Sequence, residues 1–138
     1  MKMKILIVED DSMRIEWFRE KYEGSELTVA KTVKDAVAVM KKTEFDRIFL
    51  DHDLGGETNG MSYGPRDSDR EDTGAEVVRA MIDGGLQKNA EIIVHSNNPV
   101  GAMEMMLMLS ETGYQVQAVP FSLIAAEVSD IMGVMNGN

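Results

Sequence analysis

The stretch Phe49-Leu50-Asp51-His52-Asp53-Leu54 joins a short apolar run to three ionisable side chains. The apolar residues over 46–50 predict a buried strand. Because ionised groups are costly to bury, Asp51, His52 and Asp53 should lie where this strand opens into a loop. In open α/β sheets, ligands bind at the carboxyl ends of the strands. The stretch therefore predicts a central strand with a site at its end.

Strands and helices alternate along the rest of the chain. Apolar runs at 5–8, 27–30, 92–94 and 116–119 predict four more strands, and each predicted strand is followed by a helical pattern. The residues expected to begin these helices are Asp11 or Ser12, Thr32, Thr73 in a capping box with Glu76, Asn98 before Pro99, and Ser122. Five β-α repeats predict a doubly wound α/β fold, a parallel sheet with right-handed crossovers and helices on both faces.

Composition narrows the class of protein. The 138 residues are 43% hydrophobic and 28% charged, which predicts one globular domain spanning 1–138. The net charge of −10 argues against broad binding to a nucleic-acid backbone, although a small nucleotide or a single phosphate is compatible with it. The absence of cysteine excludes disulfides and thiolate chemistry. No signal peptide or membrane-spanning run is found, so we expect a cytoplasmic protein that does not bind a membrane.

Polar groups follow three of the predicted strands. They are Glu9 and Asp10 after the first strand, Asp51, His52 and Asp53 after the third, and His95 and Ser96 after the fourth. If the strand order is 2-1-3-4-5, these strands are neighbours and their polar ends converge on one pocket. Clustered carboxylates repel one another unless a cation or a bound proton intervenes. Mg²⁺ held by Glu9, Asp10 and Asp51 would resolve that repulsion.

His52 and His95 are the only histidines of the chain, and both fall at the predicted pocket. Histidine transfers protons near neutral pH, so one interpretation is that the pair activates water and protonates a leaving oxygen. A second is that His52, Asp53 and His95 bind Zn²⁺ or Mn²⁺, which activates water. A third is that each histidine only bonds to a neighbouring carboxylate.

The stretch 55–72 is long, irregular and rich in glycine. It is interpreted either as a lid that offers Tyr63 and Arg66 to a ligand or as a disordered excursion. Residues 136–138 are expected to fray. Arg14, Arg66 and Arg70 are the cations nearest the predicted site, and we interpret them as ordinary surface arginines.

Several of these motifs resemble the receiver domain of response regulators over essentially the whole chain. The matching residues are Ile5 to Asp11, Leu50-Asp51, Ser96 and Pro120-Phe121. The resemblance implies a flavodoxin-like fold with strand order 2-1-3-4-5, Mg²⁺ held by Glu9 and Asp10, phosphate accepted by Asp51, and phosphate sensing by Ser96. Val119 departs from it, because receivers have a lysine there that pairs with the phosphoryl group. His52 and the length of 55–72 depart from it as well.

Those departures are similar to features of the cyclic-phosphate-processing receiver-like domains. The residues that carry this closer resemblance are Leu50-Asp51-His52-Asp53-Leu54, Thr73-Gly74, His95-Ser96-Asn97-Asn98-Pro99, Gly101-Ala102 and Val119-Pro120-Phe121. It implies a metal-assisted phosphoesterase that opens a cyclic phosphate on a nucleotide or an RNA end. The implied roles are catalysis by His52, His95 and Asp51, metal binding by Glu9, Asp10, Asp51 and Asp53, and phosphate binding by Ser96, Asn97 and Asn98.

Two other functions stay open. One is an atypical receiver phosphorylated at Asp51, and the other is a non-catalytic module that holds a phosphate or a metal. Val119 and the two histidines favour the enzyme, with Mg²⁺ as its expected cofactor and Mn²⁺ or Zn²⁺ as alternatives. The expected partner is a small phosphate-bearing ligand such as a cyclic nucleotide. The methionines of the helix 99–112 predict core packing or a homodimer seam.

Overall fold

The computed structural model describes residues 2–54 and 73–125. The predicted lid residues Tyr63 and Arg66, and residues 136–138, which were expected to fray, lie outside them. The elements are β1 (Lys4–Val8), α1 (Ser12–Lys21), β2 (Glu26–Ala30), α2 (Val33–Lys42), β3 (Arg47–Leu50), α3 (Gly74–Gly84), β4 (Glu91–Val94), α4 (Pro99–Glu111) and β5 (Gln115–Ala118). The strands form one parallel sheet in the order β2-β1-β3-β4-β5. The predicted fold class and strand order are confirmed.

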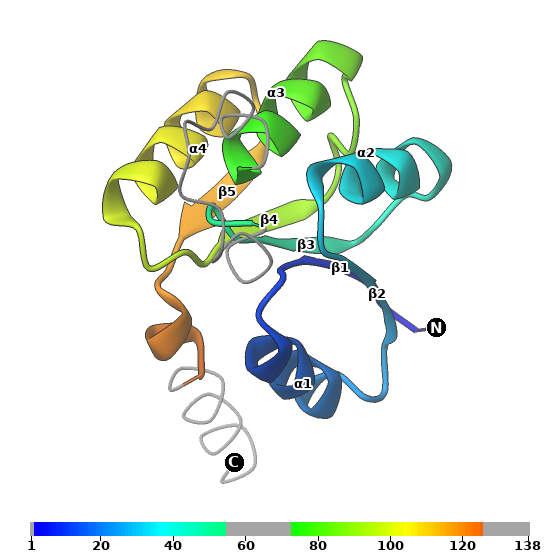
Figure 1. The fold of residues 1–138 in the computed structure, drawn as a ribbon. Coiled ribbons are helices and arrows are strands. Elements are labelled where there is room, and N and C mark those ends of the chain that lie inside the picture. The colour runs from blue at the N-terminus through cyan, green and yellow to red at the C-terminus, as the bar shows by residue number, and fades with distance from the viewer. Residues whose placement is uncertain (1, 55–72, 126–138) are drawn as a thin grey trace, which may run out of the picture.

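Helices cover both faces of this sheet (Figure 1). α2, α3 and α4 pack on one face, where their buried side chains meet Leu6, Val8 and Leu50. α1 and the helical residues 121–125 cover the other face around Phe18 and Phe49. The central strands are buried on both faces, which is why they read as continuous apolar runs.

Most helices begin where the sequence predicts. The side chains of Asp11, Thr32 and Asn98 each accept a hydrogen bond from a backbone amide three residues ahead, at 3.0, 3.1 and 3.0 Å. Thr73 is the N-cap residue of α3 as predicted, but the capping box itself does not form, because the Thr73 side chain makes no cap bond and the Glu76 carboxylate pairs with Arg79.

Ser122 does not cap the last helix. Residues 121–125 are already helical, and the amides of Leu123 and Ile124 both donate to the carbonyl of Pro120 at 3.0 Å. Proline suits this position because its fixed φ pre-organises a helix start and it needs no donor there. The last helix therefore begins at residue 121, two residues earlier than a cap at Ser122 predicts.

The start of α3 is tied to the end of β3. The Gly74 amide donates to the His52 carbonyl at 2.8 Å, and Asp53 and Thr73 form an isolated antiparallel bridge. A Cβ atom on Gly74 would lie 2.2 Å from the Asp51 carbonyl oxygen, so only glycine permits this approach. Asp53 and Thr73 therefore lie side by side.

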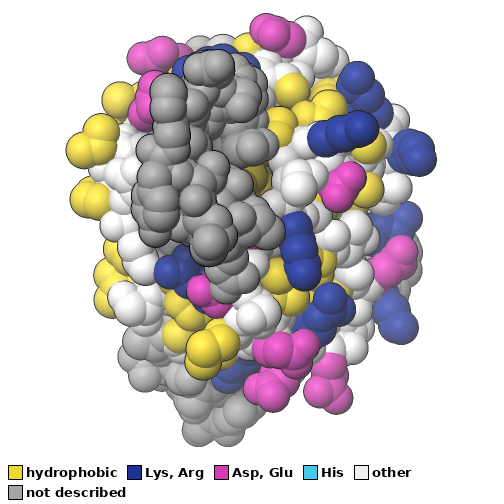
Figure 2. All heavy atoms as spheres, viewed as in Figure 1, with side chains coloured by type: hydrophobic (Ala, Val, Ile, Leu, Met, Phe, Trp, Pro, Cys, Tyr) yellow, Lys and Arg dark blue, Asp and Glu magenta, His cyan; other side chains and the backbone are white. Residues whose placement is uncertain are grey.

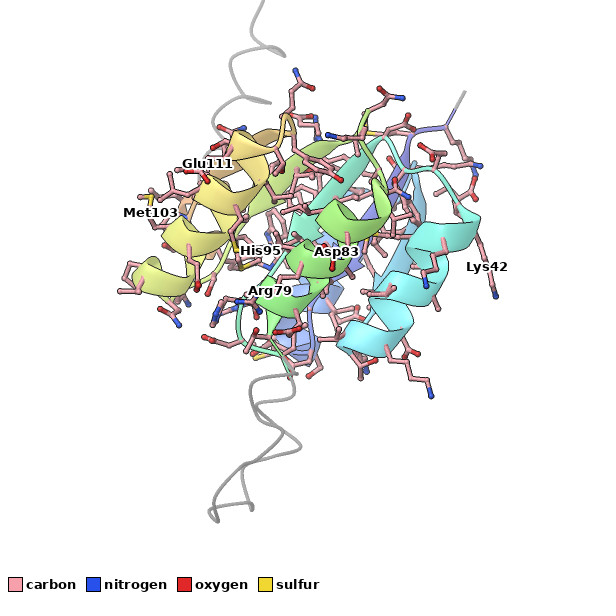
Figure 3. All side chains as sticks on the ribbon, turned by 90° about the horizontal axis from the view of Figure 1, so that it is seen from above. Lys42, Arg79, Asp83, His95, Met103 and Glu111 are labelled. Carbon is pink, nitrogen blue, oxygen red and sulfur yellow. The ribbon has the colours of Figure 1, made fainter. Side chains whose placement is uncertain are left out.

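The type of side chain exposed at the surface differs from one side of the molecule to the other. Lys and Arg side chains gather on the side where α2 lies, and hydrophobic side chains show at the edge where α4 lies (Figure 2). The exposed apolar residues of α4 are Val100, Met103 and Leu107, whereas Met105 is buried in the core. Figure 3 shows Met103 and Glu111 pointing outward from α4, while His95 lies inside the fold. Within residues 2–54 and 73–125, no helix has the length and apolar character needed to cross a membrane.

Candidate functional site

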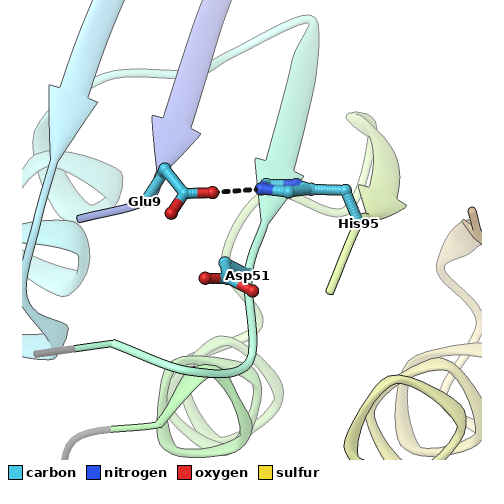
Figure 4. Close-up of side chains that lie close together, drawn as sticks. All are labelled: Glu9, Asp51 and His95. Atoms are coloured by element: carbon cyan, nitrogen blue, oxygen red, sulfur yellow. Dashed lines mark hydrogen bonds and ion pairs between the residues drawn. The ribbon is translucent and has the colours of Figure 1, made fainter. Parts of the chain in front are cut away.

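The sheet register places three polar residues side by side, each directly after the carboxyl end of β1, β3 or β4. Val8 pairs with Leu50, and Leu50 pairs with Val94. The ladder continues one residue further, because the Asp51 amide donates to the Val8 carbonyl at 3.0 Å and the His95 amide donates to the Leu50 carbonyl at 2.9 Å. Residues at matching register positions point to the same side of a sheet. Glu9, Asp51 and His95 therefore face one another (Figure 4).

These three side chains form a buried cluster. Glu9 and His95 are fully buried and Asp51 is 3% exposed. Glu9 Oε1 lies 2.7 Å from His95 Nε2, and Glu9 Oε2 accepts from the Asp11 amide at 3.0 Å. One ligand atom from each of the three residues lies within 4.8 Å of the other two. The two carboxylates at this spacing are oxygen ligands that fit a divalent cation, and the imidazole of His95 bonds to one of them.

The surroundings of Asp51 test whether a divalent cation fits this cluster. Among the described residues its Oδ1 atom has no hydrogen-bond partner, although it is buried. Burial and the nearby Glu9 carboxylate raise the pKa of Asp51 to about 7, while the Arg14 guanidinium acts in the opposite direction. An ionised Asp51 carboxylate has more negative than positive charge around it, although a backbone hydrogen bond from Asp53 favours the ionised form, and its Oδ1 atom has no partner. A cation beside Oδ1 would supply both positive charge and a partner.

His95 lies within aromatic rings. The ring centroids of Phe18, Phe49 and Phe121 are 5.4, 6.2 and 6.2 Å from that of His95. Burial lowers the pKa of His95 even though Glu9 acts to raise it, so the imidazole is neutral at physiological pH. Since the side chain has no exposed surface, it contacts Glu9 rather than solvent.

A pocket of about 200 Å³ opens over the cluster. Its lining residues are Glu9, Asp10, Asp11, Arg14, Asp51, Asp53 and Asn97. All four metal ligands predicted from the sequence are among them. Arg14, interpreted from the sequence as a surface residue, also lines the pocket, with Nη1 3.6 Å from Glu9 Oε1 and 3.8 Å from Asp51 Oδ2. The sequence did hold a signal for this placement of Arg14, because the residue lies in the first turn of a predicted helix that follows an acidic run.

His52 lies apart from the buried cluster. Its Nδ1 atom is 2.8 Å from Asp53 Oδ1 and 3.4 Å from Asn98 Nδ2. The ring packs on α4, where a Cβ atom on Gly101 would lie 2.6 Å from it. His52 and His95 have no hydrogen-bond partner in common, because His95 bonds to Glu9 inside the fold and His52 lies against Asp53 and Asn98.

The predicted phosphate-binding residues have different surroundings. Ser96 is buried, and its Oγ accepts from the Asn98 amide at 3.0 Å. The Gly101 amide is taken by the Asn98 side chain and Pro99 has no amide hydrogen, so these two backbone positions at the start of α4 are not free to receive a phosphate. Asn97 is exposed and lines the pocket.

Comparison with known proteins relates this arrangement to a family. The family model described as the cyclic-phosphate processing receiver domain matches residues 5–111. The chain belongs to this family. Among the curated proteins, none matches.

Solved structures of similar fold are receiver domains of signalling proteins. The signal receiver domain of a putative LuxO repressor protein from Vibrio parahaemolyticus is 13% identical with a TM-score of 0.61, and all of both chains is covered. A response regulator from Burkholderia pseudomallei, with a phosphorylated aspartic acid, calcium ion and citrate, is 18% identical with a TM-score of 0.61, covering 97% of this chain and 73% of that one. The chemotaxis protein CheY4 of Vibrio cholerae is 20% identical with a TM-score of 0.61, covering 87% of each chain. At these identities the likeness shows the fold alone.

In this cyclic-phosphate processing receiver domain, the end of β5 brings no charge to the site. Val119 is half-buried, and its amide donates to the Val94 carbonyl at 2.7 Å. Together with Ser96, Ala102, Met103 and their neighbours it lines a second, mainly apolar pocket of about 260 Å³. Positive charge reaches the acidic pocket from Arg14 on α1 instead.

Proposed function

We propose that this domain hydrolyses a cyclic phosphate on a nucleotide or an RNA end with the help of a divalent ion, most simply Mg²⁺. The observation that carries the proposal is the buried Asp51 Oδ1 atom, which has no partner among the described residues and lies beside Glu9 at an acidic pocket. A buried carboxylate oxygen without a partner is costly in a site that serves only the fold.

The residues that would hold the ion are Glu9, Asp10, Asp51 and Asp53. A bound divalent ion supplies charge neutralisation for the phosphate and lowers the pKa of water. His95 holds Glu9 in place through the 2.7 Å bond between Nε2 and Oε1. Because His95 is fully buried, we assign it this positioning role rather than direct contact with the substrate.

His52 is the proton-transfer group of the proposal. Its Nδ1 atom is held by Asp53 Oδ1 at 2.8 Å, which orients the ring and leaves Nε2 as the atom that exchanges the proton. In the hydrolysis, water adds to phosphorus and one ring P–O bond breaks, leaving a phosphate monoester and a free hydroxyl. His52 takes the proton from the water and returns it to the oxygen that leaves. Asn97, which is exposed at the pocket, is placed to bond to a phosphate oxygen.

The test is a hydrolysis assay on 2′,3′- and 3′,5′-cyclic nucleotides with Mg²⁺, Mn²⁺ or Zn²⁺. We expect His52→Ala and Asp51→Asn each to lower kcat by at least about 100-fold, the scale of one proton-transfer group. Glu91→Gln is the control, because Glu91 starts β4 at the opposite end of the sheet and pairs with Arg47. Absence of turnover with every metal would contradict the proposal.

A second candidate is a receiver phosphorylated at Asp51. The same unpartnered oxygen favours it, because a nucleophilic carboxylate must present a free oxygen to the phosphoryl donor. Acetyl phosphate would then label the wild-type protein but not Asp51→Asn. Labelling without hydrolysis would support this candidate and contradict the enzyme. If neither labelling nor hydrolysis occurs, the function that remains is a module that binds phosphate or metal.

A further inference from the structure

Arg14 is the one basic side chain among the described residues that line the acidic pocket. The side chain is 23% exposed. Its Nη1 atom lies 3.6 Å from Glu9 and 3.8 Å from Asp51, distances too long for direct hydrogen bonds. The guanidinium therefore lies within the field of both carboxylates, and within residues 2–54 and 73–125 no acceptor takes a hydrogen bond from it, so its N–H donors can bind another acceptor.

The pocket repels an anion unless its charge is balanced. Glu9, Asp10, Asp11, Asp51 and Asp53 line it together with the single arginine. A phosphate group brings further negative charge, which close carboxylates disfavour. A divalent ion at Glu9 and Asp51 would satisfy the two carboxylates that now attract Arg14. The guanidinium would then be free to bind phosphate oxygens through two N–H groups at once.

We propose that Arg14 is the anion-binding residue of this site, and that a divalent cation and a phosphate group bind to it with positive coupling through Arg14. This inference rests on the proposed function for the presence of the cation. Coupling of this kind is reciprocal, so each ligand raises the affinity of the other by the same factor.

The other side of the guanidinium links the site to the end of the described chain. Arg14 Cζ lies 5.3 Å from the centroid of the Phe121 ring. Phe121 in turn stands edge-on to Trp17, with ring centroids 5.1 Å apart and an interplanar angle of 78°. Trp17 is the only tryptophan of the chain. A movement of Arg14 away from Phe121 therefore changes the surroundings of the single fluorophore that dominates emission.

The experiment titrates inorganic phosphate into the protein with and without Mg²⁺, followed by calorimetry and by Trp17 fluorescence. In wild type we expect phosphate affinity to rise at least about tenfold when Mg²⁺ is present, with a shift in Trp17 emission. Arg14→Gln should lose most of the phosphate affinity and the emission shift, yet bind Mg²⁺ at least as tightly, because a competing cation is gone. Arg14→Lys keeps the charge but not the paired donors and should retain an intermediate affinity.

Arg19→Gln is the matched control, since Arg19 lies on the same helix with a side chain 52% exposed and pairs with Glu16. It should behave as wild type. Phosphate affinity that is unchanged in Arg14→Gln, or absent from wild type, would overturn the inference. Arg14-dependent phosphate binding without turnover of any cyclic nucleotide would reject the proposed hydrolysis alone, and turnover unaffected by Arg14→Gln would reject the role of Arg14 alone.

Discussion

Asp51 lies beside a second buried carboxylate, and its charge should therefore depend on pH in an unusual range. Burial and Glu9 raise its pKa from 3.8 to about 7. Between these values the folded protein keeps a proton that the unfolded chain has lost, so stability falls as pH rises through this window. Asp51→Asn has no such proton to lose. We expect the variant to gain stability relative to wild type as pH rises from about 4 to about 7.

Urea unfolding of both proteins in a metal chelator measures this difference. The lowered pKa of His95 gives a slope of the opposite sign, because the neutral buried ring resists protonation as pH falls. That contribution is present in both proteins and cancels in the comparison. A stability difference that stays constant with pH would show that Asp51 is ionised throughout.

The contact between His52 and Gly101 allows a test of whether activity depends on the position of the His52 ring. A Cβ atom at residue 101 would lie 2.6 Å from the ring, so Gly101→Ala forces His52 away from its place beside Asp53. We expect the variant to lose activity by at least about tenfold, as a misplaced proton-transfer group does, with the His52 side chain chemically intact.

Gly24→Ala is the control for this substitution, because no atom lies within 4 Å of a Cβ at residue 24. Hydrolysis assays and NMR titration of the His52 ring compare the two variants. Equal activity in Gly101→Ala and wild type would mean that His52 is not held for catalysis.

At the scale of elements, Gln87 joins two connections of the fold. The side chain accepts from the Phe45 amide at 2.9 Å and donates to the carbonyls of Met40 and Thr43 at 2.9 and 2.7 Å. Gln87 thereby ties the link between α2 and β3 to the link between α3 and β4. Loss of these bonds leaves buried backbone groups without partners, so Gln87→Ala should destabilise the protein by about 3 kcal/mol.

The backbone of Gln87 offers a matched comparison. Its φ of 59° is in the left-handed region, where alanine is strained and glycine is not. Gln87→Gly should therefore cost about 1 kcal/mol less than Gln87→Ala in chemical unfolding, although both lose the same hydrogen bonds. The opposite ranking would show that the conformation at residue 87 relaxes when the side chain is removed.

At the scale of the whole molecule, a ligand that binds only the folded chain stabilises all of it. A divalent ion at 100 times its Kd should add about 2.7 kcal/mol to the free energy of unfolding. We expect the Tm to rise with Mg²⁺ concentration in wild type and to respond little in Asp51→Asn. Circular dichroism during heating measures this, and Glu91→Gln at the far end of the sheet should keep the full response. A Tm that does not change with any divalent ion tested would contradict the proposed metal site.

Much of this architecture follows from local sequence patterns. The apolar runs ended at Glu9, Asp51 and His95, and the structure ends the strands one residue before each of them. Asp11, Thr32 and Asn98 cap helices as predicted, because a cap depends on residues three apart. Thr73 takes the predicted N-cap position but makes no side-chain cap bond, and the Gly74 amide at the start of α3 donates instead to the His52 carbonyl, a contact between residues far apart in the sequence.

By itself, the sequence determined the order of elements, the parallel sheet and the acidic ends of its central strands, since hydrophobic periodicity and chain connectivity are enough for these. The tertiary structure alone decided which side chains meet there. Glu9 bonds to His95 across 86 residues, Arg14 enters the pocket rather than solvent, and His52 packs on α4 apart from His95. Such pairings depend on sheet register and on how each helix packs, and neither leaves a periodic signal along the chain.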